Sequence, residues 1–425
     1  MNKIYKNRRK KLIDLLESES SILILSNQTQ YKNSDIEYRF RQDSSFWYLT
    51  GLNENDSALL IIKHKNNDYD EILFTKARNK NKEIWTGHIL GLERASEYTE
   101  IKKVYRFNDL EDFFENNNIC NFKKLYFDFA GNSYLDLRKK ILQIAKQKRC
   151  QEIINSEYLI SELRIIKEDY EIDLIKKSAK INCNAHKTII EMCMNNNFKY
   201  EYQVYAEFSK MFLKENANYA YEPIIASGKN ASILHYVANN QEMKKNDLLL
   251  LDVGCEYEYY ASDITRTIPL GKKFNSAQKA IYDIVLKANI AAKEQAFKLN
   301  ATIQSVHDVA VKEIIKGLID LKILKTSFDE ALETKSYMKF FMHKTSHWLG
   351  LDTHDVGFYT EKDNSSKILK TGMLFTIEPA IYFNEFYLED YEVPKEFLGI
   401  GIRIEDNLLK TDSACEVLTE IPIKL

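Results

Sequence analysis

Short apolar runs alternate with amphipathic stretches through the first third of the chain. Five runs bounded by polar or turn-forming residues have the length of β-strands. They are SILILS (21–26), FWYLTGL (46–52), ALLIIKH (58–64), EILFT (71–75) and KLYFDF (124–129). Residues 1–20, which precede these runs, predict an amphipathic helix, because the charged Asp14 and Glu17 lie among its apolar residues. This region therefore predicts an α/β domain.

From about Glu152 to Met194 the apolar positions take a helical spacing, with isoleucines set among Lys and Glu. We interpret this change as the boundary between a domain at 1–160 and a second at 161–425. The second part alternates β-rich segments with helices. The β-rich segments are 248–268, 373–383 and 399–410, and the helices are 276–298 and 303–318.

An aspartate ends the apolar run LLLL at 248–251, and a second aspartate follows eleven positions later. A hairpin with Tyr257-Glu258 as its two-residue loop sets Asp252 and Asp263 directly opposite each other, on one face. Two carboxylates at that distance repel unless one is protonated or a cation lies between them. The alternative is a strand-end cap for Asp252 and an exposed turn position for Asp263.

Two further carboxylates lie on predicted strands with apolar alternation. In MLFTIEPAIY (373–382) Glu378 faces away from Phe375 and Ile377, and in GIGIRIEDN (399–407) Glu405 faces away from the isoleucines. Three of the eight histidines, His343, His347 and His354, fall within twelve residues. The first two have the spacing of the H-E-x-x-H zinc helix, but its glutamate is absent, so that motif is excluded.

Four carboxylates and one imidazole suit Mn²⁺, Co²⁺ or Zn²⁺ better than copper or an iron-sulfur cluster. Four negative charges balance two divalent cations. The sequence therefore predicts a dinuclear centre, in which bridging carboxylates hold the ions roughly 3.5–4 Å apart.

The composition narrows the class of protein. It is 44% hydrophobic and 29% charged, with 60 basic against 62 acidic residues, which is typical of a globular protein and implies no nucleic-acid partner. The six cysteines form no C-x-x-C pair, which argues against a zinc knuckle and a disulfide framework and favours a reducing cytoplasm. We expect no membrane segment, because no run approaches the roughly 18 apolar residues that a span needs, and no signal peptide.

The order of these residues resembles the aminopeptidase P (Xaa-Pro aminopeptidase) branch of the pita-bread metallopeptidases. The segments that carry the resemblance cover nearly the whole chain. They are NSDIEYRFRQDSSFWYLTGLNE (33–54), EIWTGHILG (83–91), ILHYVANN (233–240), GCEYEYYASDITRT (254–267), FMHKTSHWLGLDTHDVG (341–357) and VPKEFLGIGIRIEDN (393–407). The resemblance implies an N-terminal creatinase-like α/β domain followed by a C-terminal pita-bread catalytic domain.

The resemblance also implies roles for individual residues. Two metal ions, Mn²⁺ being usual in this branch, are held by Asp252, Asp263, His347, Glu378 and Glu405. In this scheme Asp263 and Glu405 bridge the ions, Asp252 holds one ion, and His347 with Glu378 holds the other. Glu378 transfers the proton during hydrolysis, and His354 stabilises the developing oxyanion. His235, His343 and His354 match substrate-contacting histidines, and Arg403 and Tyr359 match residues that line the site. Trp85 matches a tryptophan lent to a neighbouring subunit, which implies a homodimer or homotetramer.

Three positions depart from the family pattern. Glu258 replaces a glycine in the hairpin loop, Lys344 a glycine after His343, and Ala380 the glycine of E-P-G. None is a ligand, and Lys344 bears on substrate preference. The implied reaction removes the N-terminal residue from peptides with proline second. The alternatives are an Xaa-Pro dipeptidase (prolidase) and, more remotely, a non-catalytic binding protein on the same fold.

Overall fold

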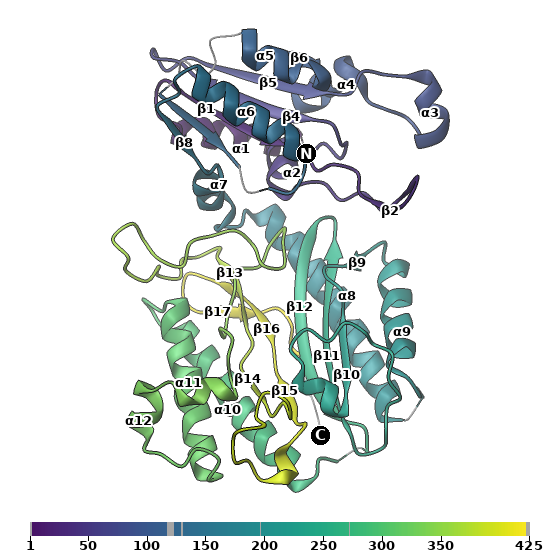
Figure 1. Cartoon of the computed structure of the whole chain (residues 1–425), viewed down its shortest axis with the longest axis vertical. Coiled ribbons are helices and arrows are strands. Elements are labelled where there is room, and N and C mark those ends of the chain that lie inside the picture. Colours follow the sequence, from purple (N-terminus) through teal and green to yellow (C-terminus); the bar gives the residue numbers. More distant parts are fainter. Residues whose placement is uncertain (1, 117–122, 129–130, 196, 272, 422–425) are drawn as a thin grey trace. The chain divides into compact units, whose positions relative to one another are not determined.

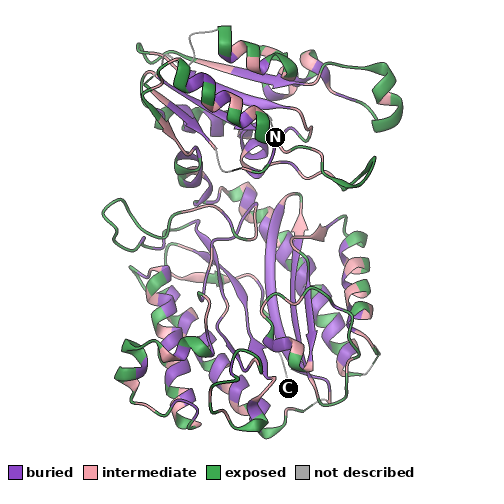
Figure 2. Ribbon diagram, viewed as in Figure 1, coloured by how far each residue is buried: buried purple, intermediate pink, exposed green. Residues whose placement is uncertain are grey.

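The computed structural model describes residues 2–116, 123–128, 131–195, 197–271 and 273–421. The chain divides into two compact units, Met1–Leu163 and Arg164–Leu425 (Figure 1). In each unit the central strands of the main sheet, β1 (Ser20–Leu25) and β4 (Ala58–Lys63) in one and β11 (Leu248–Tyr257) and β12 (Tyr260–Pro269) in the other, are buried, while most helices expose one side (Figure 2). Among the described residues, no helix combines the length and the apolar character that a membrane span requires.

The N-terminal unit is built on a six-stranded mixed sheet with the order β6-β5-β4-β1-β7-β8. Strands β1 and β4 are antiparallel, whereas β1, β7 and β8 run parallel. The strands of this unit are β1 Ser20–Leu25, β4 Ala58–Lys63, β5 Tyr69–Thr75, β6 Lys103–Arg106, β7 Lys124–Phe127 and β8 Glu152–Ile154, with a separate hairpin of β2 Tyr31–Asn33 and β3 Ile36–Glu37.

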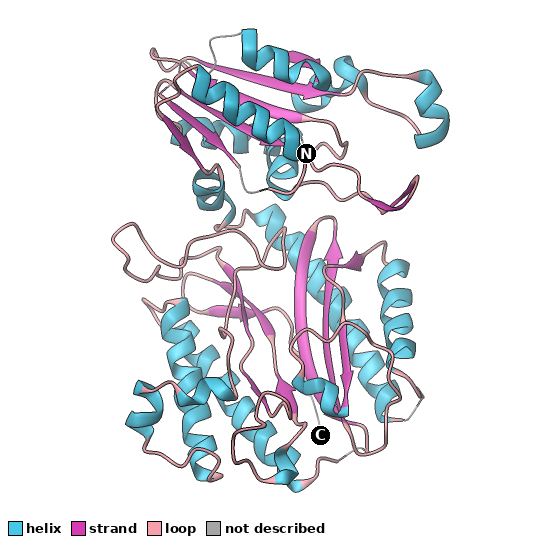
Figure 3. Ribbon diagram, viewed as in Figure 1, coloured by secondary structure: helices cyan, strands magenta, loops and turns pink. Residues whose placement is uncertain are grey.

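Helices cover both faces of this sheet (Figure 3). One face packs against α5 Leu110–Asn116 and α6 Leu135–Gln147, in a cluster that includes Leu23, Phe74 and Ile141. Helix α2 Ser44–Thr50 contacts β1 and β4 and also α1 Asn2–Leu15. The remaining helices are α3 Lys80–Thr86, α4 Gly91–Thr99, α7 Glu157–Arg164, which runs into the second unit, and the 3₁₀ turn η1 Phe107–Asp109.

The C-terminal unit holds two groups of strands, each backed by a pair of helices (Figure 1). Helices α8 Asp169–Met194 and α9 Glu201–Lys214 pack against the sheet of β9 Asn218–Tyr219, β10 Ile224–Ser227, β11 Leu248–Tyr257 and β12 Tyr260–Pro269. Helices α10 Ser276–Phe297 and α11 Ile303–Asp320 pack against β13 Leu374–Ile377, β14 Ala380–Tyr382, β15 Gly401–Arg403, β16 Asp406–Lys410 and β17 Cys415–Val417. The short elements are α12 Phe328–Glu333, η3 Gly228–Ser232, η4 Ser336–Lys339 and η5 Lys395–Phe397.

One predicted strand is wrong. Residues 46–52 belong to helix α2 and its C-cap, because Asp43 accepts a hydrogen bond from the backbone N–H of Phe46 and caps the N-terminus. Gly51, with φ +69°, ends the helix in the left-handed conformation. An aromatic-rich run of this length is ambiguous between strand and helix, and the caps at its two ends decide.

Four other predicted segments change their bounds. The stretch 152–194 is not one helix, since it contains β8, α7 and α8. The segment 373–383 is interrupted at Glu378-Pro379, and 399–410 is interrupted at Ile404-Glu405. The strand predicted at 124–129 ends at Phe127, and the last residue of that prediction, Phe129, lies outside the described residues. Cys120 also lies outside them. The other five cysteines are free thiols.

Candidate metal centre

Asp252 lies on β11, on the face that is turned away from the helices. Leu249 and Leu251 join the cluster formed with α8 and α9, whereas Asp252 alternates to the opposite face. In the hairpin with β12, Asp252 pairs with Thr265, and Asp263 pairs with Gly254. The alternation along a buried strand therefore brings a carboxylate to the interior of the unit.

The predicted hairpin register is wrong by one loop position. Tyr257 pairs with Tyr260, so the two-residue loop is Glu258-Tyr259. Both loop residues have positive φ, +45° and +75°, as a type I′ turn requires, although neither is glycine. The pairing moves by two residues, so Asp252 and Asp263 are diagonal neighbours that still share one face.

Neutral donors hold the two aspartates. The hydroxyl of Tyr221 donates to Oδ1 of both Asp252 and Asp263. The side chain of Asn407 pairs with the backbone of Asp263 as a neighbouring strand would. Its Oδ1 accepts from the Asp263 N–H at 2.9 Å, and its Nδ2 donates to the Asp263 carbonyl at 2.6 Å.

Backbone and side-chain hydrogen bonds position the two glutamates. The N–H of Glu378 donates to the Thr345 carbonyl at 2.8 Å. The N–H of Glu405 donates to the Thr265 carbonyl at 3.0 Å, and the Thr265 hydroxyl donates to Glu405 Oε2 at 2.7 Å. Asn289 on α10 donates to the carbonyls of the residues that precede the two glutamates, at 3.3 and 3.2 Å.

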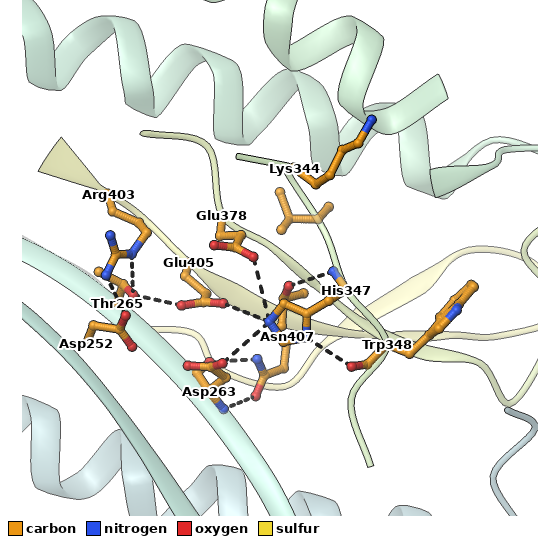
Figure 4. Close-up of polar contacts among 12 residues, drawn as sticks. Asp252, Asp263, Thr265, Lys344, His347, Trp348, Glu378, Arg403, Glu405 and Asn407 are labelled. Carbon is orange, nitrogen blue, oxygen red and sulfur yellow. Dashed lines mark hydrogen bonds and ion pairs between the residues drawn. The ribbon is translucent and has the colours of Figure 1, made fainter. Parts of the chain in front are cut away.

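His347 faces three of the carboxylates through one ring nitrogen (Figure 4). Its Nδ1 lies 2.9 Å from the Trp348 carbonyl, and because a carbonyl only accepts, Nδ1 carries the hydrogen. In the neutral ring, Nε2 then offers its lone pair to the centre, 3.6 Å from Asp263 Oδ2, 3.6 Å from Glu378 Oε1 and 3.8 Å from Glu405 Oε1. Orienting a ligand histidine through its other nitrogen is the usual arrangement at metal sites.

The carboxylates of the centre lie so close together that each disfavours the charged form of its neighbours. Burial, together with the neighbouring carboxylates, raises the pKa of Asp252, raises that of Glu378 to about 7 and raises that of Glu405 well above its ordinary value. Burial opposes the charged form of Asp263 as well, but the adjacent His347 ring lowers the pKa of this carboxyl. Burial would also lower the pKa of His347, yet the carboxylates around it raise that pKa well above its ordinary value.

These residues fit divalent cations. The ligand atoms of Asp263, His347 and Glu405 all lie within 4.8 Å of one another. Carboxylate oxygens and an imidazole nitrogen with its lone pair directed inward are the donors that such ions take. A cation among them satisfies the buried carboxylates, which otherwise repel one another.

A chain of hydrogen bonds runs from Asp252 to His343. Arg403 donates to Asp252 Oδ2 and to the hydroxyl of Tyr382. That hydroxyl donates to His343 Nε2 at 3.0 Å, since His343 Nδ1 donates to the Lys344 carbonyl at 2.8 Å. Burial and the Arg403 charge lower the pKa of His343 to about 3, so the ring is neutral.

The remaining predicted site residues surround this cluster, with one exception. The His354 ring is exposed and meets the His347 ring edge to face, with centroids 4.4 Å apart. Tyr359 stacks on Trp348 at 5.4 Å. His235 is exposed and lies close enough to lower the pKa of both His343 and His354. The exception is Trp85, which belongs to the N-terminal unit.

Trp85 lies on α3, a helix with no buried residue, and is 88% exposed. Besides Glu258, two positions depart from the family pattern. Lys344 is exposed beside His343, and Ala380 on β14 pairs with Arg403 on β15.

Five groups that hold the ligands or His343 were not predicted from the sequence: Tyr221, Thr265, Asn289, Tyr382 and Asn407. Tyr221 and Tyr382 are two of 26 tyrosines. Asn289 occupies an ordinary helical position, and no local pattern distinguishes it. Thr265 and Asn407 had a usable signal, because they follow Asp263 and Glu405 by two residues and so fall on the same side of a predicted strand.

Comparison with known proteins gives a consistent result. Residues 173–412 match the model of metallopeptidase family M24, and residues 5–125 match the aminopeptidase P N-terminal domain. The Xaa-Pro aminopeptidase of Haemophilus influenzae is 36% identical over 416 residues, which cover 98% of this chain and 93% of that protein.

Two solved structures of E. coli aminopeptidase P are similar over 99% of this chain and 95% of theirs. One contains the inhibitor Pro-Leu, with a TM-score of 0.87 and 34% identity. The other is Zn-substituted and in complex with product, with a TM-score of 0.87 and 33% identity. The predicted fold, an α/β domain followed by a pita-bread domain, is thereby confirmed. The chain belongs to metallopeptidase family M24, with the aminopeptidase P N-terminal domain ahead of its peptidase domain.

Proposed function

We propose that this chain is an Xaa-Pro aminopeptidase, a metallo-hydrolase that removes the N-terminal residue from peptides with proline in the second position. The observation that carries the proposal is the convergence of three carboxylates, those of Asp263, Glu378 and Glu405, on the inward Nε2 of His347, while Asp252 shares the Tyr221 hydroxyl with Asp263. Family membership and the names of the similar proteins support the same activity.

The proposed centre holds two divalent cations, with Mn²⁺ as the first choice and Co²⁺ or Zn²⁺ as substitutes. Asp263 and Glu405 would bridge the ions, Asp252 would bind one, and His347 with Glu378 would bind the other. The order of the side chains supports this assignment, because Asp252 lies at one end of the cluster and His347 at the other, with Asp263 and Glu405 between them (Figure 4). When bound, such ions lower the pKa of a water molecule and polarise the substrate carbonyl.

Glu378 is the proposed proton carrier. In the metal-free chain, burial raises the pKa of this carboxyl to about 7, so that it holds a proton more readily than an ordinary glutamate. It would take a proton from the attacking water and give it to the proline nitrogen, because an amide nitrogen must be protonated before it leaves. A positioned acid–base group of this kind contributes typically about 10²–10⁴-fold in rate.

His354 and His343 would contact the substrate as neutral rings. Partial desolvation by the surrounding protein and the neighbouring His347 lower the pKa of His354, and the neutral ring can donate a hydrogen bond to the developing oxyanion. The His343 ring, whose Nδ1 is 3.7 Å from Glu378 Oε2, would lie on the side of the leaving group. His235 would contact substrate beside them.

The proline ring requires a shaped pocket rather than a charge. We propose His343, Tyr359 and Arg403 as its walls, with the substrate amino group near Asp252. The exposed Trp85 would complete the pocket of a neighbouring subunit, which requires a homodimer or homotetramer. The scattered free cysteines support a reducing compartment, and we propose the cytoplasm.

The inhibitor bound by the E. coli enzyme separates this proposal from prolidase. That protein was solved with Pro-Leu, a dipeptide that begins with proline. Such a dipeptide remains when the first residue is removed from an Xaa-Pro-Leu peptide, whereas a dipeptidase releases free proline.

The deciding experiment assays the Mn²⁺-loaded protein on Ala-Pro-Ala and on Ala-Pro. An aminopeptidase releases alanine from the tripeptide, and a prolidase acts only on the dipeptide. Elemental analysis of the same sample tests the non-catalytic alternative, which predicts neither bound metal nor turnover. The His354→Ala variant should keep both ions while its turnover falls. Loss of metal from that variant would contradict the role proposed for His354.

A further inference from the structure

A buried cluster of charged side chains includes Asp355, the residue that follows His354 in the chain. None of its members is a proposed metal ligand. The side chains of Arg164, Lys167 and Asp355 are only 2%, 1% and 1% exposed. Arg164 Nη2 contacts Asp355 Oδ1, and Lys167 Nζ lies 2.8 Å from Asp355 Oδ2. The partly exposed Asp352 accepts from the same Arg164 at 2.8 Å. The proposed mechanism uses none of these charges.

Such a cluster is poor evidence for stability alone. Removing charges from water costs free energy that their mutual attraction often fails to repay, and apolar residues of similar size would frequently serve as well. What the cluster does provide is a fixed position for the Asp355 carboxylate. A Cβ on Gly350 would come 2.2 Å from Asp355 Oδ2, and Lys167 Nζ also donates to the Arg164 carbonyl at 2.8 Å, so the carboxylate is confined on several sides.

His354 has few attachments of its own. Within the part of the chain that the structure describes, its ring nitrogens have no hydrogen bond, and its only ring contact is with His347. The orientation of the ring therefore depends on its backbone. Asp355 anchors that backbone twice, because its carboxylate enters the ion cluster and its N–H donates to the Trp348 carbonyl at 2.9 Å. The same carbonyl accepts from His347 Nδ1 (Figure 4).

The two neighbouring side chains point in different directions. His354 is exposed, whereas Asp355 is buried. Holding the Asp355 carboxylate between two cations therefore determines the direction in which the next side chain projects. We infer that Asp355, clamped by Arg164 and Lys167, is a positioning residue that aims His354 at the centre. This inference rests on the proposed function, since His354 must act in turnover.

The test is a double-mutant cycle on the Mn²⁺-saturated chain with Ala-Pro-Ala as substrate. Asp355→Asn preserves the size of the side chain and removes the charge that the clamp holds. We expect kcat per metal-loaded chain to fall by about 10- to 100-fold, the usual cost of losing a supporting group, with KM little changed. In the His354→Ala background, Asp355→Asn should cause no further fall, because the residue it positions is gone.

A purely structural role gives the opposite result. The losses would then multiply in the double mutant, and that outcome would overturn the inference, as would an unchanged kcat in Asp355→Asn alone. If His354→Ala has no measurable turnover, a crystal structure of Asp355→Asn with Mn²⁺ replaces the cycle. The His354 ring should leave its 4.4 Å contact with His347, and a ring that stays in place would refute positioning.

Two further variants guard against misfolding. Arg164→Lys keeps the positive charge but not the forked reach of guanidinium, and should give a smaller fall in kcat that also vanishes in the His354→Ala background. Glu71→Gln breaks the partly buried pair with Arg9 in the N-terminal unit, and should lower Tm without changing kcat in either background. A wild-type protein inactive on Ala-Pro-Ala would instead refute the proposed function.

Discussion

Three of the four acidic ligands of the candidate centre are held by groups that can donate a hydrogen bond and carry no negative charge. Tyr221 serves both aspartates, Thr265 serves Glu405, and Arg403 supplies one full positive charge to Asp252. An isolated buried carboxylate would be strongly disfavoured, and these donors offset part of that cost. They leave oxygens for cations, so the arrangement tolerates its own charge and still requires metal to neutralise it.

Replacing the central aspartate tests this requirement at the scale of one residue. Asp263→Asn keeps the shape of the side chain and removes a charge shared by both proposed ions. We expect bound metal and hydrolysis of Ala-Pro-Ala to be lost together, as measured by elemental analysis and by alanine release. The matched control is Asp283→Asn, an exposed position on α10 that should change neither quantity. Full activity in Asp263→Asn would contradict a dinuclear centre.

At the scale of elements, helix α10 connects the two glutamate-bearing segments. The Asn289 amide is 1% exposed and donates to the carbonyls of Ile377 and Ile404, each next to a proposed ligand. One helix thereby sets the separation of two segments that are far apart in sequence. The β11–β12 hairpin supplies the other two carboxylates, and the contact of Thr265 with Glu405 joins the two groups of strands.

Removing the Asn289 amide should weaken both stability and metal binding. Asn289→Ala leaves two buried carbonyls without this donor, for which we expect about 2 kcal/mol lower free energy of unfolding. Urea unfolding of the chelated protein measures this, and titration with Mn²⁺ should show weaker binding. The control is Lys287→Ala on the exposed side of α10, expected within about 0.5 kcal/mol of wild type. Equal effects in both variants would contradict the bridging role.

The hairpin turn should accept a better residue. Glu258 has φ +45°, a conformation that costs most L-residues free energy but that asparagine adopts readily. Glu258→Asn should therefore raise the free energy of unfolding by about 0.5 kcal/mol, since Asn is favoured in type I′ turns. The same urea experiment measures the gain, and kcat should not change. A loss of stability would show that Glu258 makes a contribution beyond the turn conformation.

At the scale of the whole molecule, the concentrated negative charge links folding to pH and to metal. Asp252, Glu378 and Glu405 have raised pKa values, so the folded chain binds more protons than the unfolded chain above the ordinary carboxyl range. The free energy of unfolding then falls as pH rises, for Glu378 between about 4.5 and about 7. His347, whose pKa is raised above 6.5, contributes stability below that pH and loses it as pH rises further.

We therefore expect the chelated protein to melt at a lower temperature at pH 8 than at pH 5. Cations bind the deprotonated ligands, so excess Mn²⁺ should raise Tm more at pH 8 than at pH 5. Thermal melts in EDTA and in Mn²⁺ at the two pH values measure both effects. The lowered pKa of Asp263 acts only below about pH 4 and leaves this comparison unaffected. A chelated protein with an equal or higher Tm at pH 8 would contradict the coupled, buried centre.

The sequence by itself determined most of the framework and the candidate ligands. Alternation along a strand is a local property, so the faces of Glu378 and Glu405 followed from their apolar neighbours, and the shared face of Asp252 and Asp263 followed from the hairpin. The hairpin was also correct, but its register was not, because Glu258 and Tyr259 adopt a type I′ turn without the glycine that usually identifies one.

Tertiary structure decided what holds those ligands. Hydrogen bonds set the tautomer of His347, join Asn289 to the glutamate-bearing segments and hold Asp355 in place. In most cases the two bonded residues lie far apart in sequence. Such a contact produces no recognisable pattern in the sequence, because the two residues meet only after strands and helices have packed. The chemistry of the site was therefore readable from residue types, whereas its positioning was set by the fold.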